Sequence, residues 1–566
     1  MTDTASADSS LTARPRLIIV FLVILGALFF IPGIGTVHLF DWDEANFAES
    51  SREMIETGNY SQVTIGYEPF YEKPPFFFWL QVLSMKIFGV NEFGARMVNA
   101  CCGIATLVTV FLIGHSVYGS LFGFLWAFIF FGSFLPHLFF KSGIIDPVFN
   151  QLIFLGLTSI AKALLTGRIT IESNKKTYPL NRRLLLFALA GIFIGLAMLA
   201  KGPVALLVIC LTMAVFWAMR RFKPFVSIPE IVVFLFTTTA TAFIFFGVET
   251  LAHGTAFLRH FIAYQIHLFS TGDAGQGRPF YFHFVVILFG CFPASFFAII
   301  SFFKRDESEI RQHLFNRLML ILFWVVLILF SIVKTKTVLY SSLTWFPITY
   351  LAALSLHTLV KKKRSLSLPL AITLALFALF LGAAITAFPI LIMHKEWIVP
   401  LIPDKFALAC LDNPVHWSGY EFLLGIGYAA ATLLSLRLYQ RRRPFAGTIG
   451  LFGASALCIF LFSALFTGKI ERYCQGGPIA FYQAQATKNC YVRSLFKSYT
   501  DLFYARKKLS DRPESRSREW LLRGPIDKPV FFVCRNIEAG NWDKDTTGHL
   551  EKIKEEYGFV YYRRER

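Results

Sequence analysis

The chain has 566 residues, of which 55% are hydrophobic, 17% are aromatic and only 16% are charged, and its formal net charge is +19. This composition excludes a soluble protein of several domains, because such proteins are less apolar and carry more charged residues. It predicts a polytopic α-helical membrane protein. We therefore expect membrane lipid, and no nucleic acid, among the partners of this basic chain.

Apolar runs long enough to cross a bilayer recur from residue 17 to residue 466. The first run lacks a small-residue cleavage site, so we expect it to stay attached. About thirteen membrane spans are predicted, at residues 17–34, 96–117, 121–140, 147–166, 184–200, 203–219, 228–248, 281–302, 317–333, 338–358, 368–392, 421–439 and 445–466. Residues 74–89 are apolar but short, which favours a helix at the membrane interface.

Lysine and arginine gather in the loops on one side of these spans, as they do on the cytoplasmic side of membrane proteins. The clusters are Arg14 and Arg16; Arg168, Lys175, Lys176, Arg182 and Arg183; Arg220, Arg221 and Lys223; Lys304, Arg305 and Arg311; KKKR at 361–364; and RRR at 441–443. This pattern predicts a multi-pass protein of the inner (plasma) membrane with a cytoplasmic N-terminus. The loops 35–94, 249–280 and 393–420 and the tail from residue 469 would face the other side.

The tail differs from the rest of the chain, because charged residues are frequent and the short runs GPIAFYQ, NCYVRSLF, KPVFFVC and GFVYYRR are typical of strands. We predict a transmembrane domain at 1–467, whose first outer loop, 35–94, carries amphipathic helices. Residues 468–566 would form a small soluble α/β domain outside the cytoplasm. Nine cysteines include no CxxC pair, and Cys474 and Cys490 in the tail could form a disulfide.

The densest acidic segment, FDWDEANFAESSREMIETG at 40–58, carries six carboxylates directly after the first apolar run. Its apolar residues recur at helical spacing, which predicts an amphipathic helix at the membrane surface. Asp41 and Glu44 have the spacing of a capping box, so the acids could serve only to cap that helix. However, Asp43 and Glu44 lie at the head of the apolar stripe, where a carboxylate is costly unless it is paired or used in chemistry.

Further charges lie on the same predicted face. Asp146, in SGIIDPVFN, begins a span there, although Asp before Pro is also a common helix start. Five lysines lie at outer turns, against the cytoplasmic bias of positive charge, and each alone could be a lysine that snorkels to the interface. They are Lys73, Lys141, Lys201, Lys334 and Lys336. Together they favour an anion site, and a lipid phosphate is the natural anion at that depth.

Acids and cations at one outer surface suit the transfer of a sugar from a polyprenyl phosphate. An acceptor hydroxyl loses its proton to a carboxylate, and the departing phosphate gains charge that lysine or arginine stabilises. The aromatic runs PPFFFW and RPFYFHF would suit an isoprenoid groove and sugar stacking, although aromatic belts at membrane interfaces are the commoner cause of such runs.

The motifs DWDEANFAE, EKPPFFFWLQ, KSGIIDP, AKGP and KTKTVLYSSLTWFP occur in this order. Together they resemble the aminoarabinose transferase and protein O-mannosyltransferase superfamily of GT-C glycosyltransferases, and the aminoarabinose transferase branch most of all. The resemblance implies a GT-C fold with about thirteen transmembrane helices, an outer C-terminal domain, and an inverting transferase that uses a polyprenyl-phosphate-linked sugar. It implies that Asp43 is the catalytic base, that Glu44 completes its acidic pair, and that Asp146 is the second acid.

The resemblance also implies which residues contact the donor phosphate. Lys73 and Tyr340 match the phosphate-contacting lysine and tyrosine, and we add Lys336 from the basic KTK segment. The phosphate-binding arginine of the family falls at His267, so either the neighbouring Arg259 or Arg278 takes its place or the donor differs. Family members can bind zinc at this mouth. Here Glu72 with His253, His260 or His267 could hold zinc or magnesium, although a structural histidine is commoner.

Two other classes of function stay open. A lipid-linked sugar flippase or secondary transporter would place ionisable groups near the middle of the membrane, in broken helices and with internal repeats. A noncatalytic scaffold would keep its activity in cells after Asp43→Asn. The sugar is undetermined, and the acceptor could be lipid A, another glycolipid or a protein hydroxyl.

Overall fold

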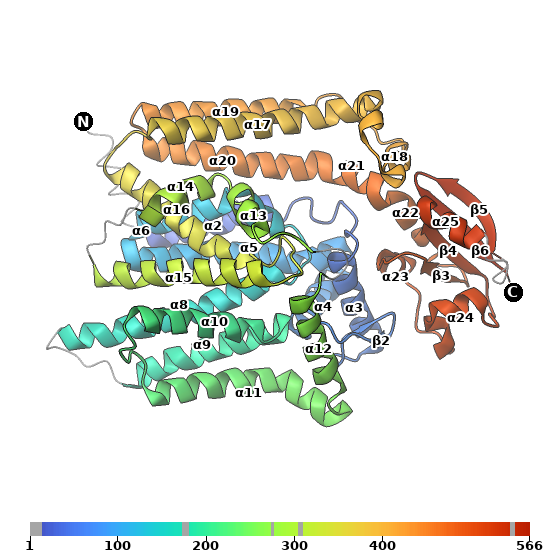
Figure 1. The fold of residues 1–566 in the computed structure, drawn as a ribbon, viewed down its shortest axis with the longest axis horizontal. Helices are drawn as coiled ribbons and strands as arrows, with labels where there is room; N and C mark the ends of the chain where they lie inside the picture. Colours follow the sequence, from blue (N-terminus) through green and yellow to red (C-terminus); the bar gives the residue numbers. More distant parts are fainter. Residues whose placement is uncertain (1–13, 173–179, 273–276, 304–308, 544–549, 566) are drawn as a thin grey trace.

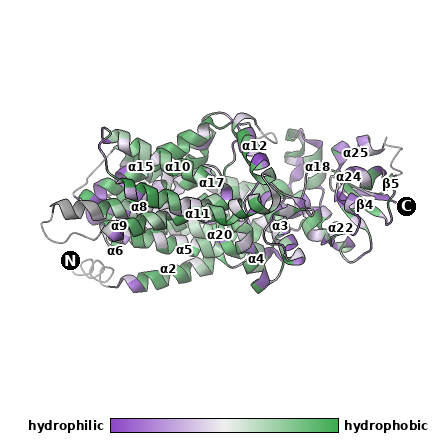
Figure 2. Cartoon of the chain, turned by 90° about the horizontal axis from the view of Figure 1, so that it is seen from below, coloured by the Kyte–Doolittle hydropathy of each residue, from purple (hydrophilic) through white to green (hydrophobic). Residues whose placement is uncertain are grey.

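The computed structural model describes residues 14–172, 180–272, 277–303, 309–543 and 550–565. Most of its helices run side by side and form a bundle, and the strands of the C-terminal residues lie beyond one end of that bundle (Figure 1). The bundle is mainly hydrophobic along its length, whereas hydrophilic residues become frequent toward the end that carries the strands (Figure 2).

Within the described residues, eight helices are long and apolar enough to cross a membrane, or nine if one bent pair counts as a single span. The protein is therefore a multi-pass membrane protein. The eight helices are α5 (Glu92–Tyr118), α8 (Asp146–Glu172), α9 (Leu180–Lys201), α11 (Ile228–His253), α15 (Ile310–Ile332), α16 (Trp345–Lys361), α17 (Leu368–Met393) and α20 (Pro444–Phe462). The bent pair is α13 (Phe282–Gly290) and α14 (Ala294–Phe303), which meet at 112° around Pro293, a residue without an N–H to continue the helix.

The remaining helices are shorter. They are α2 (Pro15–Phe30), α3 (Asp43–Thr57), α4 (Phe76–Phe88), α6 (Ser120–Phe131), α7 (Phe134–Phe139), α10 (Val204–Met219), α12 (Ala256–Ser270), α18 (Lys405–Leu411), α19 (Leu423–Gln440), α21 (Gly468–Glu471), α22 (Gly477–Gln485), α23 (Thr500–Ala505), α24 (Arg518–Arg523) and α25 (Asn536–Asp543). Single turns of other helix types are η2 (Ser342–Thr344), η3 (Lys395–Trp397), η4 (Val399–Leu401), η5 (Ser463–Thr467), η6 (Arg472–Gly476) and η7 (Pro513–Arg516).

Each of the thirteen predicted spans overlaps one of these helices, but the count of thirteen is not established. Four predicted spans fall on α2, α6, α10 and α19. Unlike the eight long helices, these four are too short or too polar to cross a membrane by length and composition. The span predicted at 121–140 is broken between α6 and α7. Gly132 lies at that break, where its backbone packs against Phe452 of α20.

The C-terminal residues form a four-stranded sheet in the order β3-β4-β6-β5. Its strands are β3 (Tyr491–Ser494), β4 (Val530–Arg535), β5 (Leu550–Glu556) and β6 (Phe559–Arg564), and a separate hairpin in the first outer loop consists of β1 (Thr64–Ile65) and β2 (Glu68–Pro69). β3 runs parallel to β4, whereas β6 is antiparallel to both β4 and β5. Three of the predicted strands are present. The fourth, GPIAFYQ, was wrong: it forms α22, where its apolar residues pack at helical spacing.

The domain boundary predicted at 467/468 falls inside a helical stretch that runs from residue 444 to residue 485. One hydrophobic core also joins the two sides of that boundary. It contains Leu39, Ala45 and Ala48 of the first outer loop together with Phe503 and Tyr561 of the C-terminal part. The two predicted domains therefore share a core, and we keep their division only as a proposal.

The acidic helix α3 differs from the amphipathic surface helix that its sequence predicts. Its polar residues are buried as well as its apolar ones, including Glu49, Arg52 and Glu53. The cause is packing on several sides, because α4, α23 and β1 all contact α3. Arg52 pairs with buried Glu49 at 2.7 Å and with the exposed Glu56, whereas Glu53 accepts hydrogen bonds from Thr64 Oγ1 at 2.6 Å and from the N–H of Tyr67 at 3.0 Å. The helix is thus part of the protein interior.

All nine cysteines are free, with Cys474 exposed and Cys490 buried, so the structure does not contain the disulfide that their spacing allowed. The predicted orientation in the membrane stays a prediction. Several basic residues used for it lie outside the described residues, namely Lys175, Lys176, Lys304, Arg305 and the side chain of Arg168.

Gly425 of α19 lies where α17 and α19 nearly touch. A Cβ atom at this position would overlap the carbonyl oxygen of Gly382 and the Oγ1 of Thr386. Small residues let membrane helices approach this closely. We expect Gly425→Val to push the helices apart, to destabilise the protein by about 1–3 kcal/mol, and to lower its melting temperature in detergent. Gly427→Val in the same helix is the matched control, since nothing lies within 4 Å of a Cβ there. Equal melting temperatures for the two variants would refute this packing.

Candidate active site

Asp43 is the first residue of α3, and an unusual turn comes directly before it. Trp42 has φ 74° and ψ −109°, a conformation that costs about 1–3 kcal/mol for such a residue. The Asp41 carboxylate holds this turn, because its Oδ1 accepts hydrogen bonds from the N–H of Trp42 at 2.8 Å and from the N–H of Tyr499 at 2.9 Å. Asp41 therefore ties the first outer loop to the C-terminal part instead of capping α3.

Glu44 is buried, and both of its carboxylate oxygens are occupied. Arg96 donates to them from Nε at 2.9 Å and from Nη2 at 2.7 Å, and the N–H groups of Phe40 and Gly143 donate at 3.0 Å and 2.5 Å. Burial alone would raise the pKa of Glu44, but the guanidinium of Arg96 holds it below its usual value. We propose that Glu44 is a positioning residue, held as an anion, and not the base itself.

Arg96, on α5, connects Glu44 to the loop that precedes α3. Its Nη1 donates to the carbonyl oxygens of Ile34 and Val37 at 2.8 Å and 2.6 Å, and its Nη2 donates to that of His38 at 2.9 Å. A buried guanidinium without its acid is strongly unfavourable. Glu44 and Arg96 therefore depend on each other, and together they fix the start of α3.

Asp43 belongs to a cluster of five charged side chains. It is accessible to solvent, yet the surrounding protein withdraws enough water to raise the pKa of its carboxyl above the usual value. The positive charges of Lys73 and Lys201 oppose this rise, whereas the negative charges of Asp146 and Glu72 add to it. We call these five residues the acid–lysine cluster. Within the described chain, neither Asp43 nor Lys73 has an ion-pair partner within 4 Å, so both charges are available to a ligand.

Lys201 is presented at the end of α9 by the turn that AKGP forms. Gly202 has φ 100°, and a Cβ atom there would lie 2.5 Å from the ring of Phe261, so this position requires glycine. Pro203 then leads into α10. The Nζ of Lys201 donates to Oδ1 of Asp146, the first residue of α8, at 2.5 Å. The end of one span and the start of another thus hold an acid and a lysine together.

A cavity of about 260 Å³ adjoins this cluster, and Lys73, Asp146, Lys201 and Tyr340 line it. The Tyr340 ring lies 5.2 Å from Lys201 Nζ, and the ring of Tyr264 on α12 lies 5.5 Å from Lys73 Nζ. Burial and the charge of Lys201 lower the pKa of Lys73. Two lysines that repel each other across one wall favour an anion beside them.

Several predicted phosphate ligands lie elsewhere. Arg259 and His267 are exposed on α12, whereas Gln265, Leu268 and Phe269 of the same helix line the cavity. This difference follows from the helical period, which sends the two basic residues to the outer face. Lys336 is buried and donates its Nζ to the carbonyl oxygen of Val333 at 2.6 Å, and it does not line the cavity.

The residues at this mouth do not fit a metal ion. Glu72 belongs to the acid–lysine cluster, but His260 is exposed, stacks 5.0 Å from the Tyr71 ring, and holds its Nδ1 2.8 Å from the carbonyl oxygen of Ala256. Among the residues that the structure describes, no three His, Cys, Asp or Glu side chains converge as zinc requires. The side chain of His253 lies outside the described residues. We assign no step to zinc or magnesium.

Three contributors to the site were missed by the sequence reading: Arg96, Tyr264 and Tyr499. An arginine four residues inside an outer span end is a signal that could have identified Arg96. Tyr499 comes from the C-terminal part, 458 residues after Asp41, and no local pattern points to it. The hydrogen bond from its N–H to Asp41 ties Tyr499 to the first outer loop. Burial, with the charges of Glu72 and Asp41 among others, raises the pKa of Tyr499 to about 12.

Known proteins that are similar to this chain include transferases named for a sugar carried on a polyprenyl phosphate. A family model described as dolichyl-phosphate-mannose-protein mannosyltransferase matches residues 72–245. Undecaprenyl phosphate-alpha-4-amino-4-deoxy-L-arabinose arabinosyl transferase 1 of Proteus mirabilis is 26% identical over 61% of this chain and 60% of its own length. The arabinosyl transferase of the same description from Wigglesworthia glossinidia brevipalpis is 23% identical over 60% of this chain and 59% of its own length. The chain thus matches less than two thirds of each of these relatives.

Among solved structures, ArnT from Cupriavidus metallidurans bound to undecaprenyl phosphate is similar to this chain with a TM-score of 0.71. The sequences are 16% identical, and the superposition covers 96% of this chain and 97% of that chain. At this identity the likeness concerns the fold. The helical bundle and the C-terminal part therefore have a shared architecture in the two proteins.

Asp43 and Glu44 should respond in opposite ways to neutral replacement. Glu44→Gln leaves buried Arg96 without its acid, so we expect a loss of about 3–5 kcal/mol in the free energy of unfolding. Asp43→Asn removes a charge that the folded protein disfavours, because the pKa of Asp43 is raised, so the melting temperature should stay the same or rise at pH 7. Thermal unfolding of both purified variants beside the parent tests this. The assignment fails if Asp43→Asn is the less stable variant.

Proposed function

We propose that this chain, a GT-C glycosyltransferase of the aminoarabinose transferase and protein O-mannosyltransferase type, moves a sugar from a polyprenyl phosphate to a glycolipid acceptor at the outer face of the membrane. One observation carries the proposal. In the acid–lysine cluster an unpaired carboxylate, Asp43, interacts electrostatically with Lys73 and Lys201, and these two lysines line a cavity whose other walls are largely apolar. This is the charge arrangement that sugar transfer from a lipid phosphate requires.

The two lysines support departure of the phosphate. When the bond between the anomeric carbon and the phosphate oxygen breaks, the oxygen keeps the electron pair and the phosphate gains negative charge. Lys73 and Lys201 supply positive charge at this wall, and Tyr340 adds a hydroxyl there. Asp146 holds Lys201 in place through the 2.5 Å hydrogen bond. In this chain Lys201 takes the role that the resemblance gave to an arginine on α12.

Asp43 acts as the general base in this proposal. The acceptor oxygen bonds to the anomeric carbon while its proton passes to the Asp43 carboxylate. The surrounding protein withdraws water from Asp43 and raises the pKa of its carboxyl, so the carboxylate accepts a proton more readily than a fully solvated one. A single displacement of this kind inverts the anomeric carbon.

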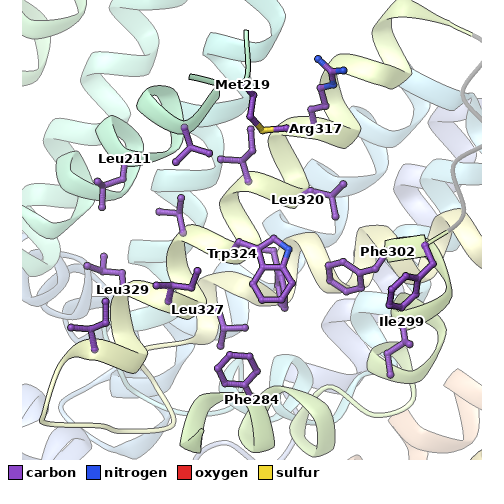
Figure 3. Close-up of a pocket in the computed structure, with 17 residues that line it drawn as sticks. Leu211, Met219, Phe284, Ile299, Phe302, Arg317, Leu320, Trp324, Leu327 and Leu329 are labelled. Atoms are coloured by element: carbon purple, nitrogen blue, oxygen red, sulfur yellow. The ribbon is translucent and has the colours of Figure 1, made fainter. Parts of the chain in front are cut away.

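The donor tail has an apolar path beyond the cluster. Leu329 lines both the 260 Å³ cavity and a second cavity of about 840 Å³. Figure 3 shows Leu211, Trp324 and Leu327 on the walls of this second cavity, with Arg317 at the opposite side from Leu329. The path follows α15 for about 18 Å between these two residues. An isoprenoid chain whose phosphate sits at Lys73 would extend between α10 and α15.

The relatives narrow the substrates that should be tested first. The two named relatives are described as transferases of 4-amino-4-deoxy-arabinose from undecaprenyl phosphate, so an amino-arabinose donor and a lipid A-like acceptor come before mannose and protein. We place the acid–lysine cluster and the C-terminal part on the extracytoplasmic side of the plasma membrane. A flippase finds no support, because Asp43, Asp146 and Lys201 lie at helix ends and not in mid-membrane.

A transfer assay tests the function directly. Purified protein in nanodiscs is incubated with radiolabelled undecaprenyl phosphate sugars and lipid A, and the label in the glycolipid is measured. We expect transfer by the parent, a loss of about 10²–10⁴-fold for Asp43→Asn, and a loss of about 10²–10³-fold for Lys73→Ala and for Lys201→Met.

Lys86→Ala is the matched control, because Lys86 is an exposed lysine of α4 whose Nζ stacks on Tyr60 at 4.7 Å, away from the cavity. It should transfer at the parent rate. The proposal is overturned if the parent moves no label from any polyprenyl phosphate sugar. It is also overturned if Asp43→Asn and Lys73→Ala transfer as fast as the parent.

A further inference from the structure

A second polar cavity lies between the C-terminal sheet and the first outer loop. Its volume is about 360 Å³, and it is lined on one side by Ile65 of β1. The other walls come from β3, from the loop that follows it, and from the start of α24, with Arg493, Lys497 and Arg518 as the basic residues. No step of the transfer described above uses this cavity.

The charge on its wall is positive. Three cations face one acid, Asp501, whose Oδ2 lies 3.9 Å from Arg493 Nη1. Asp501 is buried, and its Oδ1 has no hydrogen-bond partner. In the part of the chain that the structure describes, neither Lys497 nor Arg518 has an acid within ion-pair distance. The wall therefore keeps an excess of positive charge even when Asp501 is ionised.

This cavity adjoins the acid–lysine cluster. Tyr499 lines it, and the same side chain interacts electrostatically with Glu72 and Asp43. Lys497 Nζ lies 4.8 Å from the ring centre of Trp42, the residue directly before Asp43. An anion held by Lys497 and its neighbours would thus lie beside Trp42, one residue before the carboxylate that takes the proton.

We propose that Arg493, Lys497 and Arg518 bind a phosphate group on the headgroup of the glycolipid acceptor and so present a nearby acceptor oxygen to Asp43. This inference rests on the proposed function, since it names the part of the acceptor that the C-terminal domain recognises. Arg518 donates from Nη1 and Nη2 to the carbonyl oxygens of Leu495 and Phe496 at 3.3 Å and 3.4 Å, and Arg493 donates from Nη2 to that of Arg516 at 3.2 Å. These bonds hold the two guanidinium groups at the wall, and their remaining N–H groups, with the ammonium of Lys497, can donate to the oxygens of a phosphate.

The position of the cavity favours a lipid headgroup over a protein segment. The C-terminal sheet lies beyond one end of the hydrophobic bundle, where hydrophilic residues become frequent (Figures 1 and 2). Trp42 is exposed beside Lys497, and a flat aromatic ring is a surface on which a sugar can stack. The phosphate and the sugar of one headgroup therefore both find a partner here.

Equilibrium binding to the full-length protein in nanodiscs tests the inference without turnover. The probes are diphosphorylated lipid A, the same lipid after phosphatase treatment, and inorganic phosphate. We expect the parent to bind the phosphorylated lipid at least tenfold more tightly than the other two probes. Arg518→Ala and Lys497→Ala should each weaken that binding about tenfold and should leave undecaprenyl phosphate binding unchanged.

Two matched variants complete the experiment. Arg518→Lys keeps the charge and should recover part of the affinity. Lys552→Ala removes an exposed lysine from β5, at the opposite edge of the sheet from β3, and should change nothing. Equal binding of phosphorylated and dephosphorylated lipid by the parent overturns the inference, and so does parent-like binding by both alanine variants. Inorganic phosphate that binds as tightly as the lipid overturns it as well. The transfer assay fails or succeeds separately, so the two proposals are distinguished.

Discussion

The ion pair between Glu44 and Arg96 is the interaction on which the rest of the site depends. It is buried, it uses both oxygens of the acid, and it joins α3, α5 and the loop that precedes α3. A desolvated pair of this kind is stable only while both partners are present. Because Glu44 is fully engaged, Asp43 can remain without an ion-pair partner at the next position. One acid of the DE sequence thus fixes the backbone, and the other is the base of the transfer that we propose.

A second set of contacts completes the site from the far end of the chain. The Tyr504 hydroxyl accepts from the N–H of Leu39 at 2.6 Å and donates to Glu92 at 3.0 Å. Gln475 accepts from the N–H of Asp41 at 3.1 Å and donates to the carbonyl oxygen of Leu39 at 2.8 Å. The first outer loop is therefore held between the bundle and the C-terminal part. The bundle and the C-terminal part thus both contact the first outer loop. This explains why a shared core crosses the predicted domain boundary.

Sequence reasoning found the charges that composition makes conspicuous. Asp43, Lys73 and Asp146 stood out because each is costly at a membrane surface, and the structure brings them into one cluster. The sequence could not predict where a side chain points on a helix whose rotation is set by packing. Arg259 was therefore expected to contact the donor phosphate, but it lies on the outer face of α12. Contacts between residues far apart in the chain, such as that of Tyr499 with Asp41, could not be predicted either, because only tertiary packing brings such residues to the first outer loop.

The helical stretch at 444–485 has a mechanical consequence. It begins at Pro444, directly after the turn at one end of the bundle, and ends at residue 485 in the C-terminal part. Two π-helical turns, η5 and η6, lie within it. Helices bend at such turns, so η5 and η6 set the direction in which the chain leaves the bundle. That direction also sets the position of α23, which packs on α22 and directly follows Tyr499.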